Sequence, residues 1–289
     1  MSWRTVVIAE NAKLDYQVGY LVVRGINETK KIHIDEIGML IVENTAVSLT
    51  TYLLQELVKN KVKVIFCDNK RNPSSELMPY YGCHDTSAKI RLQIDWTVED
   101  KGAVWTEIVT EKIRKQADLL NNLKRAEAQL LNNYIKEMQF GDSSNREGHA
   151  AKVYFNALFG KGFTRTEDSP INAALNYGYS IILSMFNREV VSNGYITQIG
   201  LFHNNMFNQF NLASDLMEPF RPIVDRKVFT LLPGKFEKEE KHSMLELVEE
   251  EIRIENRKEF LGNAIKIYTR SVFDAINDRD VSKIKFYDL

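Results

Sequence analysis

The hydrophobic pattern of this 289-residue chain changes near residue 85. Before that point, apolar and β-branched residues form short runs between polar turns, at residues 5–9, 20–25, 31–34, 39–44, 46–50 and 62–68. Runs of this composition predict strands. Residues 51–61 instead repeat leucines at helical spacing and predict a single helix. The first 85 residues therefore predict a small β-rich domain.

The rest of the chain has a helical pattern. Residues 104–138 contain neither Gly nor Pro and repeat apolar residues at helical spacing. Further helices are predicted at 145–159, 171–190, 211–218 and 244–275. Residues 69–85 have the Pro, Gly and Ser content of a loop. The predicted fold class is α+β, with a β-rich domain at 1–85, a linker at 86–96 and a larger all-α domain at 97–289.

Composition excludes several classes of protein. No apolar run is long enough to span a membrane, and the first residues lack the pattern of a signal peptide. Two cysteines, Cys67 and Cys83, favour a reducing compartment, so we expect a cytoplasmic protein. The net charge of −1 does not indicate a nucleic-acid binder, but phosphate contacts need only a local basic surface. The motifs of P-loop, dinucleotide-binding and serine-hydrolase proteins are absent from the sequence.

Three clusters carry candidate chemistry. Ser144 and Glu147 fit a capping box, yet Glu147 also lies on the apolar stripe of its predicted helix, where a carboxylate needs a partner. His203 follows two apolar residues and precedes several asparagines, which predicts either a hydrogen-bonded core histidine or a ligand in a polar loop. Asp215 and Glu218, one helical turn apart before Pro219, are either a solvated pair or ligands of a shared cation. Histidine with carboxylates suits Mn²⁺ or Mg²⁺.

The same clusters carry a resemblance to a known family. The segments NREGHAAKVYF, INAALNYGYSIILS, GLFH and LASDLMEPFRP follow one another at 145–155, 171–184, 200–203 and 212–222. In this order they resemble the CRISPR-associated protein one family, the integrase of CRISPR spacer acquisition, over essentially the whole chain. NREGHAA together with QFNLASDLMEPFRPIVD is similar to the subgroup of type II-A systems.

The resemblance implies a fold, a site and partners. It implies a β-sandwich-like, dimerising N-terminal domain and a helical catalytic domain, with Glu147, His203 and Glu218 as catalytic ligands of Mg²⁺ or Mn²⁺ and Asp215 in support. The 3′-hydroxyl ends of a short duplex would attack phosphodiesters at the CRISPR leader–repeat. The implied partners are a second copy of the chain, a dimer of CRISPR-associated protein two in a heterohexamer, protospacer and repeat DNA and, in type II-A systems, the effector nuclease and a ring-shaped accessory protein.

Residues near this site are candidates for DNA contacts. We predict phosphate contacts for Arg146, Lys152, Arg221 and Arg226, with ordinary surface charge as the alternative. Tyr154 is predicted either to stack on a splayed base or to pack in the core. Two other functions remain open: a metal-dependent nuclease on branched or single-stranded DNA, and a DNA-binding scaffold in which the acids only cap helices.

Overall fold

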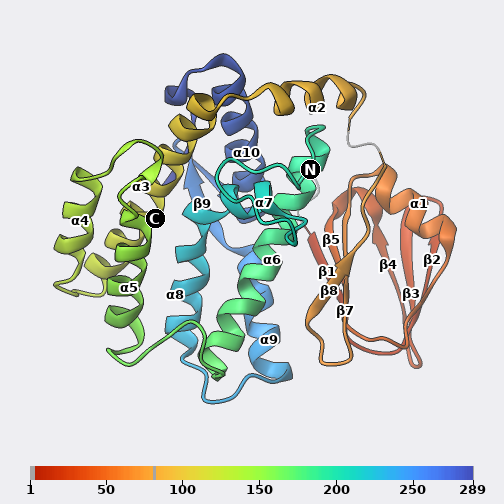
Figure 1. Cartoon of the computed structure of the whole chain (residues 1–289). Coiled ribbons are helices and arrows are strands. Elements are labelled where there is room, and N and C mark those ends of the chain that lie inside the picture. The colour runs from red at the N-terminus through yellow and green to blue at the C-terminus, as the bar shows by residue number, and fades with distance from the viewer. Residues whose placement is uncertain (1–3, 81–82, 289) are drawn as a thin grey trace. The chain divides into compact units, whose positions relative to one another are not determined.

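The computed structural model describes residues 4–80 and 83–288. The chain divides into two units, Met1–Tyr81 and Gly82–Leu289, close to the point where the sequence pattern changes (Figure 1). Each unit is described by itself. Within the described ranges, no helix is both long enough and apolar enough to cross a membrane.

The first unit contains two four-stranded sheets. One sheet has the order β1-β5-β7-β8, and its strands are β1 (Arg4–Ile8), β5 (Ile37–Val42), β7 (Lys63–Cys67) and β8 (Pro73–Glu76). β1, β5 and β7 are parallel to one another, and β8 is antiparallel to β7. The other has the order β4-β3-β2-β6, with strands β4 (Thr29–His33), β3 (Tyr20–Arg24), β2 (Lys13–Gln17) and β6 (Ser48–Leu49). The sequence pattern did not predict β2 or β8, because β2 is polar and β8 contains Pro73.

One hydrophobic core joins the two sheets of this unit. Apolar side chains of both sheets pack together, and α1 (Thr51–Lys59) adds Leu53 and Leu57 to them. The Thr50 hydroxyl caps α1 by accepting the backbone N–H of Leu53. A short 3₁₀ helix, η1 (Ile34–Glu36), connects β4 to β5. This arrangement confirms the prediction of a sandwich-like, strand-rich N-terminal region.

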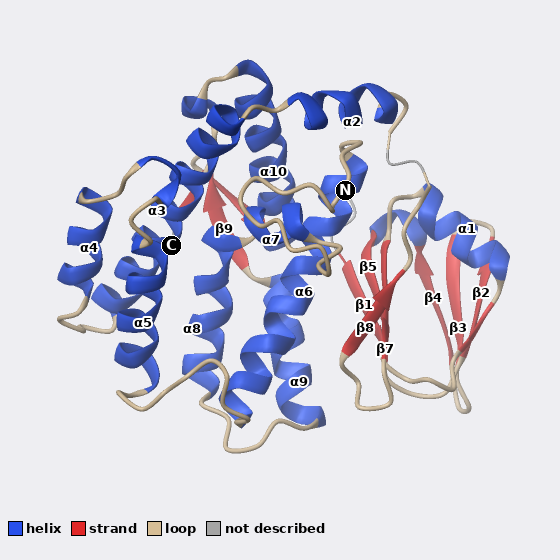
Figure 2. Ribbon diagram, viewed as in Figure 1, coloured by secondary structure: helices blue, strands red, loops and turns tan. Residues whose placement is uncertain are grey.

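The second unit is mainly helical, as Figure 2 shows. Its helices are α2 (Thr86–Asp95), α3 (Val98–Asn122), α4 (Ala128–Lys136), α5 (Arg146–Phe159), α6 (Pro170–Ser192), α7 (Asn211–Leu216), α8 (Arg221–Leu231), α9 (Lys238–Leu245) and α10 (Leu261–Asp278). Four short 3₁₀ helices lie between or after them: η2 (Phe140–Asp142), η3 (Glu218–Phe220), η4 (Glu246–Glu249) and η5 (Val281–Lys283). The predicted linker at 86–96 is wrong, because α2 occupies most of it.

The predicted single helix at 104–138 is two helices. α3 ends at Asn122, and Lys124 adopts a left-handed backbone conformation with φ of 56°. The N–H groups of Lys124 and Arg125 then bond to the carbonyls of Asn121 and Leu120. This is the Schellman pattern, formed here with Lys124 in place of the usual glycine, so no stop signal is visible in the sequence.

The predicted helix at 244–275 is also wrong in its first half. β9 (Glu251–Ile254) and β10 (Arg257–Phe260) form a hairpin there, and α10 begins only at Leu261. Glu255 and Asn256, at the turn, both have positive φ, which is typical of a two-residue hairpin loop. β11 (Tyr287–Asp288) pairs with the other side of β9, so this unit contains a small three-stranded sheet.

Candidate active site

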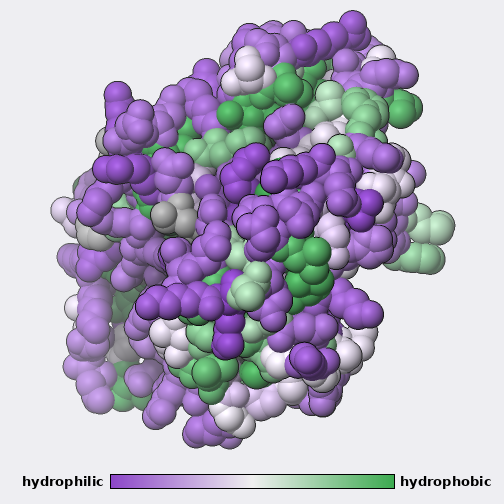
Figure 3. Space-filling view, turned by 90° about the vertical axis from the view of Figure 1, so that its left-hand side faces the viewer, coloured by the Kyte–Doolittle hydropathy of each residue, from purple (hydrophilic) through white to green (hydrophobic). Residues whose placement is uncertain are grey.

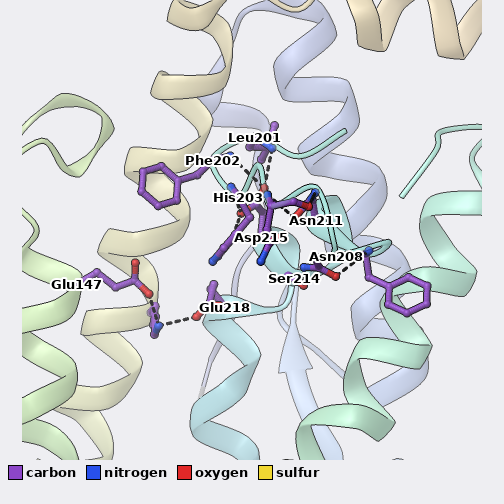
Figure 4. A network of polar contacts seen from close by, with 12 residues as sticks. Glu147, Leu201, Phe202, His203, Asn208, Asn211, Ser214, Asp215 and Glu218 are labelled. Carbon is purple, nitrogen blue, oxygen red and sulfur yellow. Dashed lines mark hydrogen bonds and ion pairs between the residues drawn. The ribbon is translucent and has the colours of Figure 1, made fainter. Parts of the chain in front are cut away.

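Lys112, near the middle of α3, contacts two of the three predicted metal ligands. Its Nζ lies 2.5 Å from Glu147 Oε1 on α5 and 2.5 Å from Glu218 Oε2 on η3. The side chain of Lys112 is 9% exposed and that of Glu218 is 3% exposed. Figure 4 shows the two carboxylates reaching toward this contact from separate segments of the chain. The fold therefore brings Glu147 and Glu218 to a common positive charge.

The start of α5 leaves the Glu147 side chain free to reach Lys112. The Asp142 carboxylate accepts the backbone N–H groups of Arg146 (2.6 Å) and Glu147 (3.1 Å), and Asn145 Oδ1 accepts that of Gly148 (3.3 Å). Asp142 and Asn145 thus cap the helix, and the capping box predicted for Ser144 and Glu147 is wrong. A Cβ at Gly148 would lie 2.8 Å from Asn145 Oδ1, so a larger residue there would have to shift the Asn145 side chain.

His203 is held by Asp215, whose carboxylate is fully buried. Asp215 accepts the backbone N–H groups of Leu201 (2.6 Å), Phe202 (3.0 Å) and His203 (3.1 Å). The His203 Nδ1 lies 2.5 Å from Asp215 Oδ1. This hydrogen bond raises the pKa of His203 against the opposing effect of burial. With Nδ1 donating to Asp215, Nε2 of the neutral ring is left as the acceptor.

The loop around His203 is fixed by local contacts. A Cβ at Gly200 would lie 2.4 Å from the His203 carbonyl and 2.6 Å from Asp215 Oδ2, so this position requires glycine. The Phe202 ring stacks on Trp105 of α3 at 4.5 Å. Asn211 Nδ2 donates to the carbonyls of Gln198 and Asn205. Asn205 and Asn208 accept the backbone N–H groups of Phe207 and Phe210, so these three asparagines bind backbone groups rather than line a ligand site with their amides.

Glu218 lies where the helix breaks. α7 ends at Leu216, and Pro219 lies in the following 3₁₀ helix, η3. The Pro219 carbonyl accepts a hydrogen bond from the buried Tyr287 hydroxyl at 2.9 Å. Arg221 Nε donates to Glu218 Oε1 at 2.9 Å. Burial disfavours the ionised carboxylate, but Arg221 and Lys112 outweigh it and lower the pKa of Glu218 to about 2. Asp215 and Glu218 thus face different partners, so they do not share one cation as a helical pair would.

The residues present decide whether the site fits a divalent cation. Glu218 Oε2 is buried, and in the described part of the chain it faces the Lys112 ammonium, 2.5 Å away. Among residues 4–80 and 83–288, no three His, Cys, Asp or Glu side chains are placed to hold a metal ion together. The Lys112 ammonium lies where Glu147 and Glu218 converge. Two carboxylates and an imidazole nitrogen nevertheless fit Mg²⁺ or Mn²⁺ by their chemistry.

A buried polar network supports one wall of the site. The Asp225 carboxylate of α8 accepts the hydroxyls of Tyr154 on α5 (3.0 Å) and Tyr179 on α6. Burial raises the pKa of Asp225 to about 6, although both hydroxyls favour its ionised form. The Arg221 guanidinium lies 4.6 Å from the centre of the Tyr179 ring. A cavity of about 210 Å³ opens beside the network, lined by Lys112, Gln116, Glu147, Phe155, Arg165, Tyr179, Glu218, Arg221 and Asp225.

The residues predicted to contact DNA differ in their burial and in their ion pairs. Tyr154 is fully buried, so its predicted stacking on a base is wrong and the core alternative holds. Arg146 pairs with Glu137, and Arg226 pairs with Glu250. Lys152 is exposed on α5 and lines a second cavity with Lys161 and Arg165. Figure 3 looks onto the side of this unit that carries α4 and α5, where most of the surface is hydrophilic. The phosphate contacts of the four cations stay predictions.

Sequence reasoning missed several residues of the site, namely Lys112, Asp142, Tyr179 and Asp225. Lys112 carried a usable signal, because it falls four residues after the apolar Ile108 on a predicted core helix. A lysine on a buried stripe needs a partner, which is the reasoning already applied to Glu147. Asp225 also follows two apolar residues in the IVD segment. Its partners lie on other helices, and local sequence does not reveal them.

Comparison with known proteins decides the family. The model of the family described as CRISPR associated protein Cas1 matches residues 5–262. The chain belongs to the Cas1 family. It is 30% identical to the CRISPR-associated endonuclease Cas1 of Neisseria meningitidis serogroup C (strain 8013), over 100% of this chain and 97% of that protein. Membership confirms the resemblance drawn from the sequence motifs.

Solved structures share the fold. A Cas1 protein from Thermotoga maritima aligns with a TM-score of 0.77 at 18% identity, over 94% of this chain and 97% of that one. A casposase bound to integration product aligns with a TM-score of 0.77 at 16% identity, over 98% and 94% of the two chains. A chain of a Cas6-RT-Cas1–Cas2 complex aligns with a TM-score of 0.73 at 17% identity, over 97% of this chain and 36% of that one. These similarities confirm a strand-rich N-terminal region followed by a helical unit.

Proposed function

We propose that this Cas1 family chain is a divalent-metal-dependent DNA integrase of CRISPR spacer acquisition. It would join the 3′-hydroxyl ends of a short duplex to phosphodiesters at the CRISPR leader–repeat. The observation that carries the proposal is the convergence of the Glu147 and Glu218 carboxylates on one positive charge. The shared fold with a casposase bound to integration product supports the reaction class.

Each residue has a role in this proposal. Glu147, Glu218 and His203 Nε2 would hold Mg²⁺ or Mn²⁺. When bound, such an ion activates a hydroxyl and stabilises charge on the phosphoryl oxygens. Asp215 orients the His203 ring through Nδ1, and such supporting carboxylates tune ligand affinity. Arg221 keeps the buried Glu218 ionised and limits its motion.

The proposed assembly contains protein and DNA partners. We assign the chain a homodimer, with dimerisation through the N-terminal unit, and a dimer of CRISPR-associated protein two. The similar fold within a Cas6-RT-Cas1–Cas2 complex supports the second partner. Opposite copies of the chain would then attack opposite ends of the repeat. The attack at either end of the repeat uses no nucleoside triphosphate, because transesterification exchanges one phosphodiester bond for another of similar energy.

A nuclease is the second candidate. The curated relatives carry the name endonuclease, and the same site would cut DNA if water replaced the 3′-hydroxyl as the nucleophile. The third hypothesis, a scaffold whose acids only cap helices, does not agree with the structure. Glu147 and Glu218 direct their carboxylates to Lys112 and Arg221 rather than to helix N-termini.

One experiment separates the integrase from the nuclease. The chain and its small partner are incubated with Mn²⁺, a supercoiled plasmid carrying a repeat, and labelled duplexes ending in 3′-hydroxyl or 3′-deoxy nucleotides. The integrase predicts that label enters the plasmid only from 3′-hydroxyl ends. Plasmid nicking that is the same with both duplexes, without joined label, would leave only the nuclease.

A further inference from the structure

We propose that Lys112 is a built-in cation of the active site, which holds Glu147 and Glu218 together in the metal-free chain and competes with the divalent ion for them. The inference rests on the proposed metal-dependent function. It adds a residue that the three-ligand description does not contain. It also predicts a direct effect of Lys112 on metal affinity.

Lys112 lies between the two carboxylates. Lys112 Nζ lies at the same distance, 2.5 Å, from one oxygen of each carboxylate. Arg221 is the other cation paired with Glu218, but its Nε contacts Oε1, the oxygen that does not face Lys112. Within the described residues, the ion pairs of Glu147 are made with Lys112 alone. Lys112 is therefore the cation that the two carboxylates share.

The charge of Lys112 balances that of the carboxylates. Two carboxylates held close together repel each other, and the buried Glu218 also loses hydration, so a shared cation stabilises the pair. Lys112 meets this need in the absence of metal. A divalent ion bound to the same two oxygens would lie close to the ammonium, and like charges at such distances repel strongly. Metal binding therefore requires the ammonium to withdraw.

The cavity offers the ammonium a second position. Gln116 follows Lys112 by one helical turn and lies on the same side of α3, so its side chain is within reach. Gln116 Oε1 is buried and, in the part of the chain that the structure describes, lacks a hydrogen-bond donor. The Asp225 carboxylate lines the same cavity of about 210 Å³. The ammonium can turn toward these acceptors when the metal takes its place.

The test compares two lysines of the same helix. Lys112→Met removes the shared cation and keeps side-chain length. Lys115→Met is the matched control, because Lys115 is equally buried but pairs with Glu111 at 3.0 Å and does not contact Glu147 or Glu218. Mn²⁺ affinity is measured on the full chain by calorimetry, and the unfolding midpoint is measured with EDTA and with Mn²⁺.

We expect Lys112→Met to bind Mn²⁺ about tenfold more tightly than the wild type does, which is equivalent to about 1.4 kcal/mol. The Mn²⁺ affinity of Lys115→Met should equal that of the wild type. With EDTA the Lys112→Met chain should unfold at a lower temperature than the wild type. Mn²⁺ should raise the unfolding midpoint of Lys112→Met by more than it raises that of the wild type. Equal or weaker Mn²⁺ binding by Lys112→Met would overturn the inference. Absence of Mn²⁺ binding by the wild type would instead contradict the proposed metal-dependent function.

A measurement on the wild type covers the case in which Lys112→Met does not fold. The ammonium resonances of ¹⁵N-lysine-labelled protein are followed while Mg²⁺ is added. The Lys112 signal should shift as its partners change, and the Lys115 signal should stay in place. A Lys112 signal that is unchanged at Mg²⁺ concentrations that saturate the site by calorimetry would overturn the inference.

Discussion

Asp215 and Glu218 are the same kind of side chain in neighbouring turns, but their surroundings give them different roles. Asp215 accepts three backbone N–H groups and the His203 ring, so both of its oxygens are occupied. Glu218 faces Lys112 and Arg221, which are cations. A carboxylate surrounded by N–H donors is a positioning group, whereas one that faces cations fits a metal ligand.

Asp215→Asn tests this positioning role. An amide replaces one carboxylate oxygen, so at least one buried backbone N–H loses its acceptor, at a cost of about 1–3 kcal/mol in the free energy of unfolding. Mn²⁺ affinity should fall about 10–100-fold, because the orientation of His203 is lost. Urea unfolding and calorimetry measure the two effects. Asp278→Asn, at an exposed ion pair with Lys283, is the control, and equal behaviour of the two variants would contradict the role.

Individual site residues differed in how far the sequence could predict them. Glu147, His203 and Glu218 stand in motifs whose order resembles a family, so they could be proposed together. Local reasoning alone left each of them with an ordinary structural alternative. Lys112 and Asp225 were missed because their importance comes from partners on distant segments. A buried charged residue signals that a partner exists, but the sequence does not say which one.

At the scale of elements, the site depends on three short segments that deliver side chains with little freedom. These are the start of α5, the loop before α7 and the break at η3. The loop depends on Gly200, because any Cβ there would meet the His203 carbonyl and Asp215. The turn signals of these segments were visible in the sequence. Their hydrogen bonds were not, since Asp142 rather than Ser144 caps α5 together with Asn145.

Gly200→Ala tests the loop as an element. The added methyl would push the His203 backbone and Asp215 apart, and overpacking of this kind costs about 1–3 kcal/mol in the free energy of unfolding. The Mn²⁺ affinity of Gly200→Ala should fall together with its stability. Gly162→Ala is the matched control, because a Cβ at Gly162 would meet no atom within 4 Å. Unfolding curves that coincide for the two variants would show that the loop tolerates the methyl group.

The Asp225 network joins α5, α6 and α8, and it predicts a pH dependence. The pKa of Asp225 is about 6 in the folded chain, above its ordinary 3.8. The folded state therefore holds this proton more tightly than the unfolded state, and the stability that the proton provides is lost as pH rises toward 6. Asp225→Asn removes the titration. Relative to the wild type, its free energy of unfolding should rise by about 2 kcal/mol between about pH 4.5 and pH 7.5.

Urea unfolding at the two pH values measures this difference. Asp274→Asn serves as a control for the loss of an aspartate on another helix of the same unit. If Asp225→Asn and the wild type show the same change in stability with pH, Asp225 does not carry the titration assigned to it.

At the scale of the whole molecule, the two-part organisation followed from the change in hydrophobic period, and the structure divides at nearly the same point. The local hydrophobic period also predicted most helices and the strands that have alternating or apolar runs. Polar β2, the Pro-containing β8 and the β9–β10 hairpin were not, because long-range pairing rather than local pattern fixes them. The convergence of Glu147 and Glu218 on Lys112 within the helical unit is a property of its tertiary fold.

The most direct test of the proposed function is the joining of DNA by a Glu218→Ala variant. Wild-type and variant chains, each with CRISPR-associated protein two, are incubated with a labelled 3′-hydroxyl duplex and a supercoiled repeat plasmid, in Mn²⁺ or EDTA. Circular dichroism verifies that the variant is folded, and Glu239→Gln, at an exposed glutamate, is the control. The proposal predicts that label enters the plasmid only with the wild type or Glu239→Gln and only in Mn²⁺. Equal joining by folded Glu218→Ala, or equal joining in EDTA, would contradict it.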